Sequence, residues 1–135
     1  MSEQIQAVVG RTSVRHVAAD GSDIEHGLRE YFTYRDTGLK EATSGAYTAH
    51  VIRAVPGKQG EAEWHTHETT FQLVFVLRGW IDFEFEDIGV VRLVPGSSCY
   101  FPSGVRHQVL GNSDDFEQLE IVSPGDFATN PASKP

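Results

Sequence analysis

Short runs of alternating apolar and polar residues, broken at close intervals by glycine and proline, restrict the fold of this chain most strongly. The apolar members are mostly Val, Ile, Phe, Tyr and Trp, which favour strands. Turn residues such as Pro56-Gly57 and Pro95-Gly96 separate the runs. No segment keeps apolar residues at helical spacing over a useful length. We therefore predict strands over residues 30–35, 46–55, 61–67, 71–77, 80–86, 90–94, 98–101, 106–110 and 116–122.

Many short, evenly spaced strands in a chain of 135 residues predict an all-β sandwich or barrel that forms one domain. A chain of this length buries enough surface to fold without disulfides or structural metals. We expect the barrel to span residues 29–128. The polar residues 1–28 would form an arm or edge strand that adds to a partner subunit. Residues 129–135 would form a frayed tail.

Composition limits the partners and the compartment. The formal net charge is −8, with no run rich in Lys or Arg, so we expect neither nucleic-acid nor membrane binding. A single cysteine, Cys99, excludes an internal disulfide and fits the reducing cytosol. The N-terminal residues do not resemble a signal peptide. No run approaches the about 20 apolar residues needed to span a membrane. We therefore expect a cytoplasmic protein.

A pair of histidines on one predicted strand indicates a metal site. Residues two apart on a strand point to the same face, so His65 and His67 would lie about 7 Å apart on one side. A tight turn after Glu68 would form a hairpin that pairs His67 with Gln72. Paired residues share a face, so Gln72 would point at the same spot as the two histidines.

A third histidine follows a turn with the spacing Gly96-x5-Pro102-x-Gly104-x2-His107. Spacing alone does not place His107 beside the first pair, and a barrel would have to bring them together. Three imidazoles suit a transition metal. The alternative is that these histidines are ordinary core or surface residues of a barrel that binds no metal.

Together, the two histidine motifs resemble the signatures of the cupin superfamily. The first reads His65-Thr-His67-x4-Gln72-x6-Gly79, and the second is the spacing that ends at His107. The resemblance covers about residues 47–122. It implies a cupin double-stranded β-helix (jelly-roll) barrel of two antiparallel sheets, and a homodimer. It also implies one divalent transition metal per chain (iron, manganese, nickel, zinc or cobalt), with His65, His67, Gln72 and His107 as ligands.

Three positions depart from the family pattern. Gln72 stands where the family usually has a glutamate ligand, Gly60 lies one residue closer to His65, and the expected asparagine is displaced to Asn112. Only the first departure changes the chemistry. A neutral amide leaves the charge of a divalent metal uncancelled, so the site should favour a small anionic, oxygen-rich chelating substrate such as a hydroxy acid or keto acid.

Acid–base residues are less constrained by the sequence. Glu120 lies in the last predicted strand, where cupins often carry a general acid or base. It faces the metal if the even-numbered residues point inward, and it is solvated if Leu119 and Ile121 do. Tyr47 is a second candidate catalytic residue. The mouth of the barrel could also be lined by His50, Arg53 and Tyr100.

Three functions remain open at this point. The first, which we favour from the sequence, is a mononuclear non-haem metal dioxygenase-like enzyme, because three-histidine cupins include thiol dioxygenases and diketone-cleaving enzymes. The second is a non-redox isomerase, cyclase or lyase that acts on a sugar acid or keto acid. The ligand set resembles that of uronate-opening cupins, but those carry an arginine after the proline that corresponds to Pro124, and Gly125 stands here. The third is a non-catalytic cupin that binds a small molecule.

Overall fold

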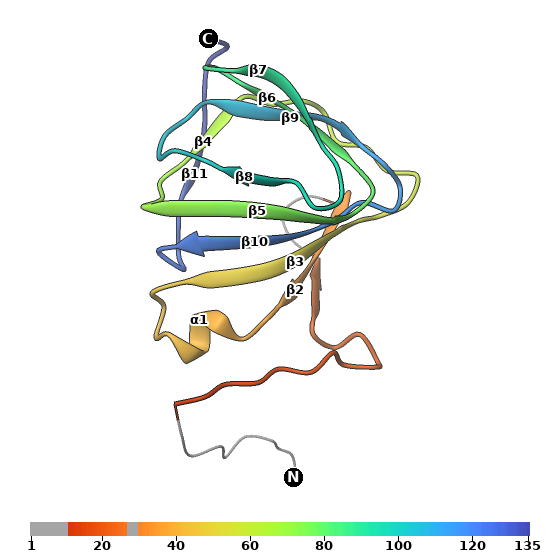
Figure 1. Cartoon of the computed structure of the whole chain (residues 1–135), viewed down its shortest axis with the longest axis vertical. Helices are drawn as coiled ribbons and strands as arrows, with labels where there is room; N and C mark the ends of the chain where they lie inside the picture. Colours follow the sequence, from red (N-terminus) through yellow and green to blue (C-terminus); the bar gives the residue numbers. More distant parts are fainter. Residues whose placement is uncertain (1–10, 27–29) are drawn as a thin grey trace.

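Two antiparallel sheets face each other in the computed structural model, which describes residues 11–26 and 30–135 (Figure 1). The six-stranded sheet has the order β1-β2-β3-β10-β5-β8, and the five-stranded sheet has the order β11-β4-β9-β6-β7. The elements are β1 (Ile24–His26), β2 (Phe32–Asp36), α1 (Leu39–Ala42), β3 (Thr48–Ala54), β4 (His65–His67), β5 (Phe71–Arg78), β6 (Ile81–Phe85), β7 (Gly89–Leu93), β8 (Ser98–Tyr100), β9 (His107–Asn112), β10 (Glu117–Ser123) and β11 (Thr129–Pro131).

Alternation along the strands places one face of each sheet in the core. On β6, Ile81, Phe83 and Phe85 are buried, and the residues between them are only partly buried. On β5, Val74 and Val76 are fully enclosed in the same way. These side chains from both sheets form one apolar cluster, which confirms the predicted all-β fold of two antiparallel sheets.

A glycine makes the crossing from β5 to β6 possible. Gly79 adopts φ 66°, in the left-handed region that favours glycine. A Cβ at this position would lie 2.9 Å from Cα of Phe116, a fully buried core residue. The close approach of the two segments therefore requires the absence of a side chain at residue 79.

The predicted hairpin between β4 and β5 is wrong. Strand β4 pairs with β9 and β11, whereas β5 pairs with β10 and β8, so the chain changes sheets after His67. Gln72 lies opposite Val122 and not opposite His67. The polar residues Glu68, Thr69 and Thr70 before β5 gave no signal for this crossover, because a hairpin and a sheet change both need a turn at the same place.

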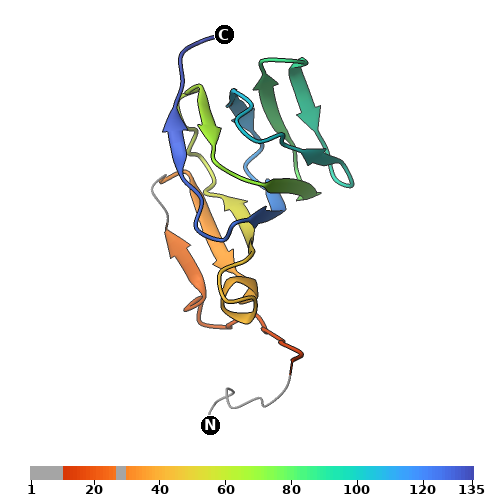
Figure 2. The ribbon, with the colours of Figure 1, turned by 90° about the vertical axis from the view of Figure 1, so that its left-hand side faces the viewer.

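The ends of the chain also differ from the expectation. The frayed tail expected at residues 129–135 is wrong for its first part, because β11 pairs with β4 (Figure 2). At the other end, β1 pairs with β2 at the edge of the six-stranded sheet. Residues 1–10, 27 and 28 of the predicted arm lie outside the described residues. Within the described residues, no helix is long and apolar enough to cross a membrane.

Candidate metal centre

Two neighbouring strands bring the three predicted histidines together. His65 and His67 lie on β4, and His107 begins β9, where it pairs directly with His65. One ligand nitrogen from each ring lies within 4.8 Å of the other two. The ring centroids of His65 and His107 are 4.2 Å apart, and those of His67 and His107 are 5.0 Å apart. The arrangement therefore presents three imidazoles to a single point.

Backbone carbonyls orient two of the rings. His65 Nδ1 lies 2.8 Å from the carbonyl oxygen of Glu63, and His107 Nδ1 lies 3.0 Å from that of Val105. A carbonyl oxygen only accepts, so Nδ1 carries the proton in both rings and the lone pair is on Nε2. This is how proteins commonly hold metal-binding histidines in the correct tautomer and orientation.

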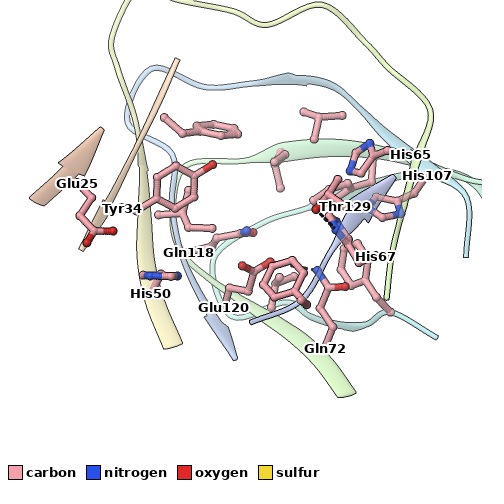
Figure 3. A pocket seen from close by; sticks show the side chains of 18 residues that line it. Glu25, Tyr34, His50, His65, His67, Gln72, His107, Gln118, Glu120 and Thr129 are labelled. Carbon is pink, nitrogen blue, oxygen red and sulfur yellow. Dashed lines mark hydrogen bonds between the residues drawn. The ribbon is translucent and has the colours of Figure 1, made fainter. Parts of the chain in front are cut away.

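The third ring is oriented by a residue that the sequence did not indicate. His67 Nδ1 lies 2.9 Å from Thr129 Oγ1, and the two residues are paired between β4 and β11 (Figure 3). Thr129 was predicted to belong to the tail. Its role depends on β11 folding back across the barrel, a contact between residues 62 positions apart that no local pattern reveals.

Two aromatic side chains pack against the ring of His107. Its ring stacks on Phe85 with centroids 5.9 Å apart and meets Phe101 edge-on at 4.9 Å. His107 is 2% exposed, and His65 is also buried. Such close packing leaves these two rings little rotational freedom.

A cavity of about 300 Å³ opens from the histidines into the space between the sheets. This volume is at the lower end for small-molecule sites, so the cavity suits a small ligand. Its described walls contain no Lys or Arg. It is lined by Glu25, Phe32, Tyr34, His50, Ile52, His65, His67, Gln72, Val74, Ile81, Phe83, Phe101, His107, Val109, Gln118, Glu120, Phe127 and Thr129.

Glu120 and Gln72 line this cavity and are hydrogen-bonded to each other. Gln72 Nε2 donates to Glu120 Oε2 at 3.1 Å. On β10 the even-numbered residues face inward, so of the two orientations left open for Glu120 the structure has the inward one. Burial raises the pKa of the Glu120 carboxyl above its ordinary value, and the hydrogen bond from Gln72 offsets only part of that rise.

The other proposed residues divide into two groups. Tyr47 is 42% exposed and Tyr100 is 55% exposed, and neither lines the cavity. Arg53 does not line the cavity either, and it forms an ion pair with Glu117. His50 does line the cavity, and desolvation by burial lowers its pKa, with Asp36 and Glu25 acting in the opposite direction.

The donor set fits a divalent transition metal. Three imidazoles converge on one point. At least two of them are neutral tautomers with the proton on Nδ1, so their Nε2 atoms are of the kind that coordinates a transition metal. Gln72 lines the same cavity, and since its Nε2 is bonded to Glu120, its Oε1 is the atom that a metal would use. Its place as fourth ligand stays a prediction.

Comparison with solved structures shows the same fold in several enzymes. The polyketide cyclase RemF from Streptomyces resistomycificus aligns with a TM-score of 0.66 and 18% identity over 97% of this chain and 88% of that chain. KdgF from a Halomonas species aligns with a TM-score of 0.61 and 20% identity over 79% and 92%. A deletion mutant of oxalate decarboxylase OxdC from Bacillus subtilis aligns with a TM-score of 0.63 and 22% identity over 82% of this chain but 30% of that chain.

Sequence comparison identifies the family. No curated protein matches this chain significantly in sequence. The family model of the cupin domain, however, matches residues 51–123, more than half of the chain and the segment that contains all three histidines. With its two-sheet barrel and converging histidines, the chain belongs to the cupin family.

Proposed function

We propose that this cupin is a metal-dependent enzyme that moves a proton on a small, anionic, oxygen-chelating substrate, as in a cyclisation or an isomerisation. The observation that carries the proposal is the shared cavity of Glu120 and the three histidines. A carboxyl group held beside a metal-binding site is a general acid or base within reach of a chelated substrate.

The histidines account for binding the anionic end of the substrate. They would hold one divalent transition metal, which when bound acts as a Lewis acid on a carbonyl or hydroxyl oxygen of the substrate. Neutral imidazoles do not cancel the charge of such an ion. Since the described cavity wall contains no Lys or Arg, the anionic group of a substrate belongs at the histidine end.

Glu120 accounts for the proton transfer. Gln72 donates to Glu120 Oε2, so Glu120 Oε1 is the oxygen that exchanges a proton with the substrate. In the forward step a C–H bond next to a carbonyl breaks, the proton goes to Oε1, and the electron pair moves to the carbonyl oxygen. Return of the proton to another carbon or oxygen completes an isomerisation. Gln72 keeps the carboxyl group oriented throughout.

The names of two structural relatives fit a non-redox reaction without specifying it. RemF is a polyketide cyclase, and another relative, which aligns with a TM-score of 0.58, is described as a sugar phosphate isomerase. Because these structures are less than 25% identical in sequence to this chain, they support the fold alone. The proposed reaction is therefore argued from the cavity of this chain.

An oxygenase is the second candidate, because three neutral imidazoles leave positions for both a chelating substrate and oxygen. The two candidates differ in whether oxygen is consumed. A cupin that only binds its ligand would show neither oxygen uptake nor proton exchange.

Deuterium exchange tests the proposal. Phenylpyruvate, an aromatic keto acid, is incubated in deuterated buffer without oxygen with metal-loaded protein, and deuterium at C3 is followed by NMR. We expect exchange well above the rate in buffer, and an at least hundredfold loss in Glu120→Gln at unchanged metal content, as is typical for loss of a general base. Exchange no faster than in buffer, or equal rates in the variant, would contradict the proposal. Oxygen uptake in a parallel aerobic sample would favour the oxygenase.

A further inference from the structure

The cavity wall contains a buried amide group whose oxygen has no hydrogen-bond partner among the residues that the structure describes. Gln118 is 5% exposed and lines the cavity, and among the described residues none hydrogen-bonds its Oε1. Buried polar atoms in native proteins nearly always have a partner, and an unpaired one destabilises the fold. A ligand in the cavity is the natural source of the missing donor.

Gln118 lies away from the histidines along the barrel. On β10 the inward-facing residues follow the order Val122, Glu120 and Gln118, and Val122 is the one that pairs with Gln72. Gln118 is therefore about 13 Å along the strand from Val122, at a rise of about 3.3 Å per residue. In the view of Figure 3 its side chain lies between Tyr34 and Glu120, on the side away from the histidines.

Apart from Glu120, the wall between these two ends is apolar. Ile52, Val74, Ile81, Phe83 and Phe101 all line the cavity and are buried. A sugar acid would place several hydroxyl groups against these side chains without partners, which is unfavourable. An aromatic or other apolar group has no hydrogen bonds to lose there, and it buries apolar surface against these side chains.

The far end suits a neutral donor better than a second anion. The described cavity residues include no Lys or Arg, and burial lowers the pKa of His50, which favours its uncharged form. Gln118 Oε1 accepts a hydrogen bond and cannot donate one. A hydroxyl group on the substrate is uncharged and can donate a hydrogen bond to Gln118 Oε1. An ionised phosphate group is negatively charged and has no proton to donate.

We infer that Gln118 is a specificity-determining residue that accepts a hydrogen bond from a hydroxyl group at the far end of an aromatic substrate whose anionic chelating group lies at the histidines. This inference rests on the proposed function for the orientation of the substrate. It narrows the substrate class to phenolic acids and excludes sugar acids and sugar phosphates.

A matched pair of ligands tests the inference by binding alone. Phenylpyruvate and 4-hydroxyphenylpyruvate differ only in the hydroxyl group at the far end of the ring. Calorimetric titration without oxygen, with and without metal, gives the ratio of their dissociation constants. We expect the wild type to bind the hydroxylated acid about tenfold more tightly, as for one hydrogen bond to a buried partner. In Gln118→Leu the ratio should fall to about one, because leucine cannot accept.

A buried glutamine outside the cavity supplies the control. Gln108 is also buried, but its Nε2 donates to Glu84 at 2.8 Å and it does not line the cavity. Gln108→Leu should keep the tenfold ratio and lower the stability to urea. Gln118→Leu should leave the ligand-free protein as stable as the wild type or more stable, since it removes an unpaired buried atom. Gln118→Met provides a second apolar variant of similar length.

Several results from the binding measurements would each overturn the inference. They are a wild-type ratio near one, a ratio that Gln118→Leu and Gln118→Met leave unchanged, and failure of the wild type to bind either acid. A loss of stability in Gln118→Leu equal to that in Gln108→Leu would assign Gln118 to the fold instead. Absence of deuterium exchange together with a Gln118-dependent ratio would count against the proposed reaction and leave the binding subsite standing.

Discussion

Gln72 and Glu120, on the neighbouring strands β5 and β10, are joined by a hydrogen bond of 3.1 Å inside the cavity that holds the three histidines. Gln72 stands where cupins usually have a glutamate. A carboxylate there would lie within about 3 Å of the Glu120 carboxylate, and repulsion between the two like charges would disfavour the ionised form of Glu120. The substitution thus allows Glu120 to titrate as a single acid.

The first prediction concerns this pair. Gln72→Glu should keep the metal but bind oxalate about tenfold more weakly, because it adds negative charge beside the ion. Oxalate binding is measured by calorimetry on protein of known metal content. Gln72→Leu, which removes the hydrogen bond without adding charge, is the control and should retain oxalate binding. Unchanged affinity in Gln72→Glu would refute the charge argument.

The second prediction concerns the pH dependence of stability in the metal-free protein. The pKa of Glu120 is raised in the folded state above its ordinary value of 4.5, so folding favours the protonated form. Its contribution to stability is complete below the unfolded pKa and is lost as pH rises through the folded pKa. The wild type should therefore lose stability relative to Glu120→Gln as pH increases above about 4.5.

Urea denaturation at a series of pH values measures this difference. His50 pairs with Glu120 across β3 and β10 and also titrates, so the series is repeated in a His50→Gln background. A stability difference between wild type and Glu120→Gln that stays constant with pH in both backgrounds would disprove the raised pKa.

The third prediction concerns Thr129. Thr129→Val removes the hydrogen-bond partner of His67 Nδ1 and should weaken metal binding about tenfold, as is typical when the residue that orients a metal-binding histidine is lost. Competition with a chromophoric chelator measures the affinity. Thr66→Val is the matched control, because Thr66 lies on β4 between the two histidines, faces the other side and does not line the cavity. Equal affinities in the two variants would show that Thr129 does not act on His67.

The fourth prediction concerns the core. Phe116 is fully buried and contacts Phe32 with ring centroids 5.9 Å apart. Phe116→Ala should lower the free energy of unfolding by about 3–5 kcal/mol, through lost burial and the cavity left behind. Phe75→Ala should have a much smaller effect, because Phe75 is 41% exposed. Urea denaturation compares the two, and similar losses would contradict the assigned core.

The sequence predicted the fold class and the pair of His65 and His67 because both depend on short-range patterns. Alternation defines the inward face of a strand, and the spacing of His65 and His67 places both on it. The approach of His107 required knowledge of the family, since no local rule pairs β4 with β9. An aromatic residue does not by itself mark the core, because Phe75 lies on the outer face of β5 and is 41% exposed.

Residues whose role depends on long-range contacts were missed. Thr129 joins the site through β11, and Gln118 joins it through the orientation of β10, which the sequence left open. Tyr47, an aromatic residue just before β3, was expected at the mouth of the barrel; it is 42% exposed and does not line the cavity. Periodicity alone could not decide which of two half-apolar faces of β10 would turn inward.

Metal content measured on His107→Ala against the wild type tests the central claim most directly. Both proteins are purified without chelator or histidine tag, reconstituted with zinc, nickel, manganese or ferrous iron, and analysed by elemental mass spectrometry; circular dichroism checks that the variant is folded. The account predicts about one equivalent of metal per wild-type chain and severe loss in a folded His107→Ala, because three converging imidazoles form the site. Equal metal content in the two proteins, or none in the wild type after every reconstitution, would contradict it.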